Sequence, residues 1–203
     1  MQMRVDDLGV IKSIELPDSF TRGAVVLGGI GRNWRRIFHP RDKRDAQAVS
    51  IISYFRGGPA PPADGKMLRK LLAKPCGLIY SSEPESTNAH PQAPTLINAL
   101  VDALGNAGNN QLTNPETGFG GPCFFLEKVE TIELNKKNVL AVHGYFHDRE
   151  LNAENFYTGV FVDASPNDAE CLIEELVFEA NTPRLYEKYY SSFQKALNTI
   201  RWN

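Results

Sequence analysis

Hydrophobic and polar residues alternate along short segments in the last third of the chain, which is typical of strands. The alternation is clearest over residues 129–134, where it predicts one buried and one exposed strand face. The Asn- and Lys-rich residues 133–138 suit a hairpin turn between two such segments. The pattern predicts four consecutive strands, over residues 123–134, 139–146, 156–162 and 171–178.

After the last of these strands the hydrophobic period lengthens to three or four residues, which indicates a helix. Thr182 can cap the first backbone N–H groups, and Pro183 is well tolerated at the first helical position. The apolar stripe of this helix must be buried, and it comprises Leu185, Tyr189, Phe193, Leu197 and Ile200. We therefore expect an α+β fold, with helices packed on the faces of an antiparallel sheet and a long C-terminal helix.

The first half of the chain is less regular. Strands are predicted over residues 10–16, 34–38 and 46–55, and helices over residues 64–74 and 95–105. Gly- and Pro-rich residues 57–63 and Asn-rich residues 106–121 are predicted to be loops.

Composition favours one ordinary globular domain, spanning residues 1–203, because the chain is 42% hydrophobic and has a mean hydropathy of −0.32. No segment is long and apolar enough to insert in a membrane, and the N-terminus lacks a secretory hydrophobic region. We expect a cytoplasmic protein, and a signal peptide removed from the sequence stays open. Three widely spaced cysteines argue against a disulfide framework or zinc cage and are expected to be buried: Cys76, Cys123 and Cys171.

Charge is unevenly distributed along the sequence. Residues 1–74 hold 14 Lys and Arg against 7 Asp and Glu, whereas residues 75–203 hold 8 against 17. A concentrated basic segment includes Arg32, Arg35, Arg36, Arg41, Lys43 and Arg44. We expect it to bind an acidic protein partner, although a solvated loop paired with nearby acidic residues is the alternative. Nucleic acid is not expected, because no nucleic-acid-binding motif is present and the net charge is −2.

No catalytic residue, metal site or cofactor is predicted, because the sequence contains no nucleophile elbow and no His-Glu-x-x-His motif. The glycines at 28–31 lack the third glycine of a dinucleotide fingerprint. His143 and His147 share a strand face about 13 Å apart, at ~3.3 Å per residue, too far for one ion. Two groups have a structural interpretation: Glu127, Glu130, Glu174 and Glu175 as solvent-facing strand residues, and Tyr186, Tyr189, Tyr190 and Phe193 as core.

The order of elements over residues 129–203, with Ile-Glu-Leu-Pro at 14–17, resembles the Mog1/PsbP-like α/β/α sandwich. The resemblance is architectural, and it implies a non-catalytic binding role. Members of that group bind small GTPases, assist photosystems, or serve as bacterial adaptor or immunity-type proteins. The resemblance carries no functional residue onto this sequence.

Two hypotheses follow. The first is a soluble, non-enzymatic protein-interaction module of bacterial type (adaptor, chaperone or immunity-type protein), with residues 32–44, 57–63 and 106–121 as contact surfaces. The alternative is an enzyme or ligand-binding domain of unknown substrate, with a pocket between sheet and helices. Its candidate residues lie on predicted central strands: His143, Tyr145 and Tyr157.

Overall fold

The computed structural model describes residues 2–27, 34–55, 62–83, 123–148, 152–167 and 172–203. Strands dominate these residues, with two helices, α1 (Pro62–Leu72) and α3 (Pro183–Leu197). The strands are β1 (Gln2–Leu8), β2 (Ile11–Pro17), β3 (Phe20–Leu27), β4 (Trp34–Pro40), β5 (Val49–Phe55), β6 (Gly77–Ser81), β7 (Cys123–Leu134), β8 (Lys137–Asp148), β9 (Ala153–Asp163), β10 (Ile173–Ala180) and β11 (Arg201–Trp202). The predicted α+β class is therefore wrong, because this is a β-rich fold.

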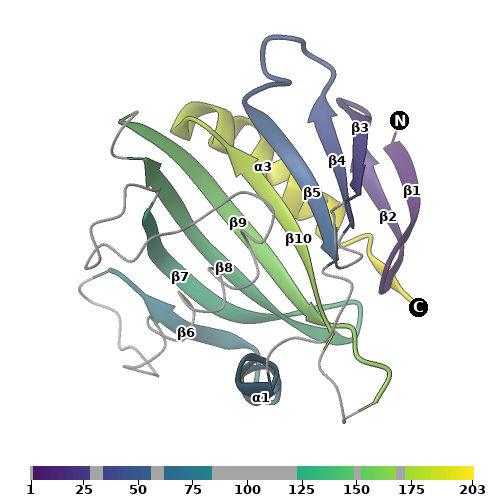
Figure 1. Cartoon of the computed structure of the whole chain (residues 1–203), viewed down its shortest axis with the longest axis vertical. Coiled ribbons are helices and arrows are strands. Elements are labelled where there is room, and N and C mark those ends of the chain that lie inside the picture. Colours follow the sequence, from purple (N-terminus) through teal and green to yellow (C-terminus); the bar gives the residue numbers. More distant parts are fainter. Residues whose placement is uncertain (1, 28–33, 56–61, 84–122, 149–151, 168–171) are drawn as a thin grey trace.

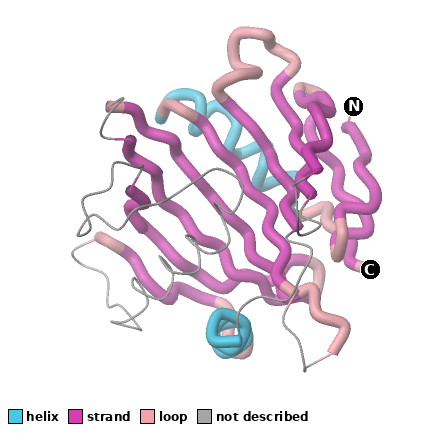
Figure 2. The backbone as a smooth tube through the Cα atoms, in the orientation of Figure 1, coloured by secondary structure: helices cyan, strands magenta, loops and turns pink. Residues whose placement is uncertain are grey.

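One large antiparallel sheet contains eight strands in the order β3-β4-β5-β10-β9-β8-β7-β6 (Figures 1 and 2). The predicted turn between β7 and β8 is confirmed, and it is built by Asn135 and Lys136 at φ values of 47° and 68°. Positive φ at both central residues matches the twist of a tight hairpin, and Asn adopts this conformation readily. The order also places β5 directly beside β10, although more than 100 residues separate them in the sequence.

A second, three-stranded sheet has the order β1-β2-β11, and α3 packs against both sheets (Figure 1). Thr182 caps α3 as predicted, accepting a hydrogen bond from the backbone N–H of Leu185 at 3.3 Å. Within the predicted apolar stripe, Tyr189, Phe193 and Leu197 are buried. The C-terminal helix and its buried side are thus confirmed.

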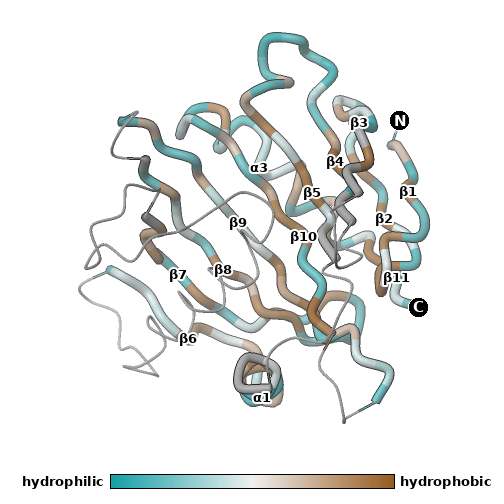
Figure 3. The backbone as a smooth tube through the Cα atoms, in the orientation of Figure 1, coloured by the Kyte–Doolittle hydropathy of each residue, from teal (hydrophilic) through white to brown (hydrophobic). Residues whose placement is uncertain are grey.

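Hydrophobic residues recur along most strands of the large sheet (Figure 3). Buried hydrophobic residues form a core on each of its two faces. On the α3 face, Leu134, Val160 and Phe178 pack with residues of α3 and the small sheet. The opposite face, hereafter the α1 face, packs residues such as Val129 with Leu68 of α1. The prediction of one exposed face is wrong for β7, because alternate residues of this strand meet two different cores.

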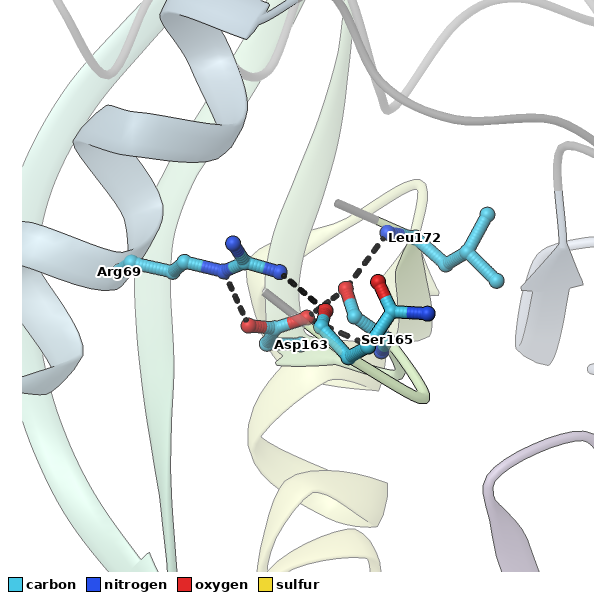
Figure 4. A network of polar contacts seen from close by, with 5 residues as sticks. Arg69, Asp163, Ser165 and Leu172 are labelled. Carbon is cyan, nitrogen blue, oxygen red and sulfur yellow. Dashed lines mark hydrogen bonds and ion pairs between the residues drawn. The ribbon is translucent and has the colours of Figure 1, made fainter. Parts of the chain in front are cut away.

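A polar network attaches α1 to the segment that follows β9 (Figure 4). Arg69 Nε donates to Asp163 Oδ2 at 2.9 Å, and the Arg69 guanidinium also donates to the Asn167 carbonyl at 3.1 Å. Ser165 donates to the other Asp163 oxygen and accepts a hydrogen bond from the Leu172 N–H at 2.8 Å. Burial alone would raise the pKa of Asp163, but hydrogen bonds from Ser165 and Arg69 hold it below its ordinary value.

Most other described elements match the predictions from the sequence. The strands expected at 10–16, 34–38 and 46–55 and the helix at 64–74 correspond to β2, β4, β5 and α1. Strands β1, β3, β6 and β11 were not predicted. The predicted helix at 95–105, the loop at 106–121 and the glycines at 28–31 lie outside the described residues.

Candidate functional site

A groove of about 720 Å³ lies between α3 and the strands at one end of the large sheet. Its strand side includes Ser81, Glu127, Lys128, Glu130 and His143, and its helix side consists of Tyr186, Tyr190 and Gln194. A smaller cavity of about 200 Å³ adjoins it and shares Glu130, His143, Tyr190 and Gln194 with it. These two connected spaces, hereafter the α3 groove, have the size of a ligand pocket.

The two walls of the groove follow from two different periodicities. Lys128 and Glu130 are two residues apart on β7, so both side chains lie on the face that α3 covers. Tyr186, Tyr190 and Gln194 are spaced by four residues along α3, so they form one row beside the buried stripe. The rings of Tyr186 and Tyr190 stack with centroids 4.9 Å apart.

Glu130 is the electrostatic centre of the groove. One carboxylate oxygen lies 3.5 Å from His143 Nε2, and the other lies 2.9 Å from Lys128 Nζ. His143 and Lys128 lower the pKa of Glu130 to about 2, against the opposing effect of burial. Glu130 is therefore ionised at neutral pH, and its assignment as a solvent-facing strand residue is incomplete because it also lines a cavity.

His143 connects the groove to a short chain of buried hydroxyl groups. Its Nδ1 lies 3.0 Å from Thr158 Oγ1, which also forms a hydrogen bond with the Tyr186 hydroxyl. Burial raises the pKa of the Tyr186 phenol, so it stays protonated at neutral pH. Among the described residues, His143 Nε2 is buried without a hydrogen-bond partner, since its 3.5 Å approach to Glu130 lacks hydrogen-bond geometry.

This arrangement does not favour nucleophilic catalysis. Glu130, His143 and Thr158 are in the order of an acid, a base and a hydroxyl nucleophile. However, Thr158 is only 1% exposed, and its hydroxyl is already shared between His143 and Tyr186. A nucleophile must approach the reacting atom of its substrate closely, so these contacts orient the imidazole ring instead.

The three predicted pocket residues do not lie together. His143 lines the α3 groove, whereas Tyr145 on the same face stacks on Phe125 with ring centroids 5.0 Å apart. Tyr157 is on the α1 face and is 1% exposed. The prediction of one pocket containing all three side chains is therefore wrong.

Tyr157 is instead part of a buried pair with Glu175, to which its hydroxyl donates a hydrogen bond. Glu175 is 4% exposed, so its assignment as a solvent-facing residue is wrong. Glu174 is partly buried and accepts a hydrogen bond from the Val10 N–H at 2.7 Å. Burial raises the pKa of Tyr157 well above its ordinary value. The absence of a side chain at Gly159 makes room for the pair, since a Cβ there would stand 2.0 Å from the Tyr157 hydroxyl.

The predicted basic segment is distributed over a strand and a turn. Arg36 of β4 donates to the backbone carbonyl of Asp6 at 3.1 Å, and Arg41 donates to that of Phe20 at 3.3 Å. Lys43 and Arg44 are exposed in the following turn. Arg32 and the side chain of Arg35 lie outside the described residues, so binding of an acidic partner stays a prediction.

Two other predicted features can be placed. Residues 57–61 of the predicted loop 57–63 lie outside the described residues, and residues 62 and 63 begin α1. Cys76 is exposed, so the expectation of a buried thiol is wrong there, while the side chains of Cys123 and Cys171 are not described.

Sequence reasoning found His143 but missed most of the groove. Glu130, Tyr186 and Tyr190 had been interpreted as strand surface or core. The row of Tyr186, Tyr190 and Gln194 is the one sequence signal for the groove, because it lies to one side of the apolar stripe and ends in a polar amide.

The sequence matches no protein-family model and no curated protein. Within the described part of the chain, no helix is both long and apolar enough to cross a membrane. Those same residues contain no cluster of three or more His, Cys, Asp and Glu side chains that could hold a metal ion.

Proposed function

We propose that this chain is a non-enzymatic protein-interaction module, of the adaptor, chaperone or immunity type, and that the α3 groove holds a segment of its partner. The single observation that carries this proposal is the groove itself, with its row of tyrosines facing an ionised carboxylate. Aromatic side chains that present both an apolar ring and a polar group are favoured where proteins bind other molecules.

The hydrogen bonds that link His143, Thr158 and Tyr186 favour binding rather than catalysis. The ring nitrogen Nδ1 is hydrogen-bonded to the Thr158 hydroxyl, which is itself shared with the Tyr186 hydroxyl, so these groups are already committed to one another. A rigid, pre-oriented wall reduces the entropy lost when a ligand binds.

The proposal is tested with isotope-labelled protein and short soluble peptides of four kinds: repeats of Gly with Lys, Glu, Gln or Phe. At least one kind should perturb backbone NMR signals on β7, β8 and α3 more than elsewhere. Replacing Ser82, an exposed residue of the groove wall, by Trp should remove that response. Ser191→Trp, the same change at an exposed α3 residue that does not line the groove, is the matched control.

Perturbations that stay the same in Ser82→Trp would contradict binding in the groove. So would the absence of any localised response to all four peptides. Chemical conversion of a peptide during the titration would contradict the non-enzymatic assignment.

A further inference from the structure

The charges around the α3 groove favour one class of partner. Among the described lining residues, the carboxylates of Glu127 and Glu130 face one ammonium group, on Lys128. Lys128 is itself paired with Glu130 at 2.9 Å. The lining therefore has an excess of negative charge even with Glu130 partly neutralised.

The helix wall adds a second, independent preference. Tyr190 lines both parts of the groove. Its ring stacks on Tyr186 at 15° from parallel and lies nearly perpendicular to the His143 ring, with centroids 6.2 Å apart. Burial raises the pKa of Tyr190, so its ring is that of a neutral phenol. The face of such a ring attracts ammonium and guanidinium groups.

The inner cavity has a mainly apolar lining. Ile132, Leu134, Val160 and Leu197 line it beside the polar Thr158 and Asn198, and Glu130 and His143 line both this cavity and the larger space. Lysine and arginine have the matching shape, because their aliphatic stems pack on apolar surfaces while their charged ends reach polar groups.

His143 Nε2 completes the argument, because it is a buried nitrogen without a hydrogen-bond partner among the described residues. It lies 3.5 Å from a Glu130 carboxylate oxygen without forming a hydrogen bond to it. The Glu130 carboxylate therefore keeps the capacity to accept from a ligand group that brings several N–H donors and a positive charge.

Resting on the proposed function, we infer that the α3 groove binds a basic polypeptide segment and that it receives a lysine or arginine side chain at Glu130. The ammonium or guanidinium group donates to the Glu130 carboxylate and lies against Tyr190. The ligand competes with Lys128 for the same carboxylate, so the internal ion pair weakens binding.

This competition predicts opposite changes in affinity when Glu130 and Lys128 are replaced, which a purely structural role for the two residues does not predict. A fluorescent peptide of repeating Gly and Lys is titrated with protein, and its affinity is compared with those of the Glu and Gln peptides. Glu130→Gln should weaken binding of the Lys peptide about tenfold, equivalent to about 1.4 kcal/mol. Lys128→Gln should strengthen it about threefold, because it removes the competing cation.

Glu187→Gln is the matched control, since Glu187 is an exposed α3 residue outside the groove, and its affinity should equal that of the wild type. Raising the salt concentration from about 50 to about 300 mM should weaken binding of the Lys peptide severalfold. Melting curves of each variant establish that the fold is retained. Free spermidine distinguishes a polypeptide ligand from a small polyamine. If the groove binds polypeptides, the Lys peptide should bind more tightly than spermidine.

Equal or tighter binding of the Glu peptide would overturn the inference, as would an unchanged affinity in both Glu130→Gln and Lys128→Gln. Tighter binding of spermidine than of the Lys peptide would also overturn the assignment to a polypeptide. If only the Gln or Phe peptide bound in the groove, the cationic class would be wrong while the proposed function stood. If no peptide bound there, both would fail.

Discussion

Replacing Gly159 by Ala is expected to be one of the most destabilising single-methyl additions in this protein. A Cβ at this position would lie 2.0 Å from the Tyr157 hydroxyl oxygen and 2.9 Å from a carboxylate oxygen of Glu175. The Tyr157 ring has little room to move, because it packs edge-on against Phe124 and Phe146 with centroids 5.5 Å away in each case. The methyl group must therefore separate the hydroxyl from Glu175.

Two effects contribute to the expected loss of stability. Inserting a methyl group into a closely packed core costs about 1–3 kcal/mol. Losing a hydrogen bond to a buried carboxylate costs about 1.5–3 kcal/mol more. Together they predict a decrease of about 2.5–6 kcal/mol in the free energy of unfolding, a large share of the stability of an ordinary domain.

Urea denaturation at neutral pH measures this change, and a double-mutant cycle identifies its cause. Tyr157→Phe alone removes the hydrogen bond. In the Tyr157→Phe background, Gly159→Ala should cost at least about 1.5–3 kcal/mol less than in the wild type, because both the bond and the hydroxyl oxygen that the methyl group would meet are already absent. A loss below about 1 kcal/mol for Gly159→Ala would refute the packing argument, and purely additive effects would refute the role of the Tyr157–Glu175 hydrogen bond.

Three further predictions concern the helix cap, the groove and the basic turn. Thr182→Ala should lower the free energy of unfolding by about 1 kcal/mol, measured by urea denaturation, because the cap to the Leu185 N–H is lost. The lowered pKa of Glu130 implies stabilisation that is present above pH 4.5 and lost as the pH falls toward about 2. That shift corresponds to about 3 kcal/mol of stability, which solvent screening reduces to about 1–2 kcal/mol. The free energy of unfolding of Glu130→Gln should therefore lie below that of the wild type by this amount at pH 7 and by much less at pH 3. If an acidic partner binds the turn that contains Lys43 and Arg44, replacing both residues by Glu should abolish retention of the protein on immobilised poly-glutamate without changing its melting temperature. Unchanged retention would contradict a binding site at this turn.

The elements predicted correctly are those whose signals are local in the sequence. The β7–β8 hairpin depends on the Asn135–Lys136 turn, and α3 depends on Thr182, Pro183 and an apolar stripe. The fold class was wrong because β1, β3, β6 and β11 were missed. The pairing of β5 with β10 depends on contacts between distant segments, which local alternation does not encode.

The candidate site was only partly predictable because strand pairing decides which face each residue occupies. His143 pairs with Thr158, so Tyr157, one residue earlier, points to the opposite face of the sheet. Sequence reasoning identified both side chains as central but could not separate them. Once this register is known, His143 belongs to the groove and Tyr157 to the packed pair with Glu175.

The charge asymmetry of the sequence becomes an asymmetry in space through the strand order. The described residues 20–27 and 34–55, which include β3, β4 and β5, contain six Lys and Arg against two Asp and Glu, and these strands form one side of the large sheet. The described residues 123–148, 152–167 and 172–180, which include β7 to β10, contain three Lys and Arg against nine Asp and Glu and supply most of the other side. The α3 groove lies on this acidic side. The long-range electrostatic field of that side would therefore attract a basic segment toward the same groove in which contacts with Glu130 would hold it.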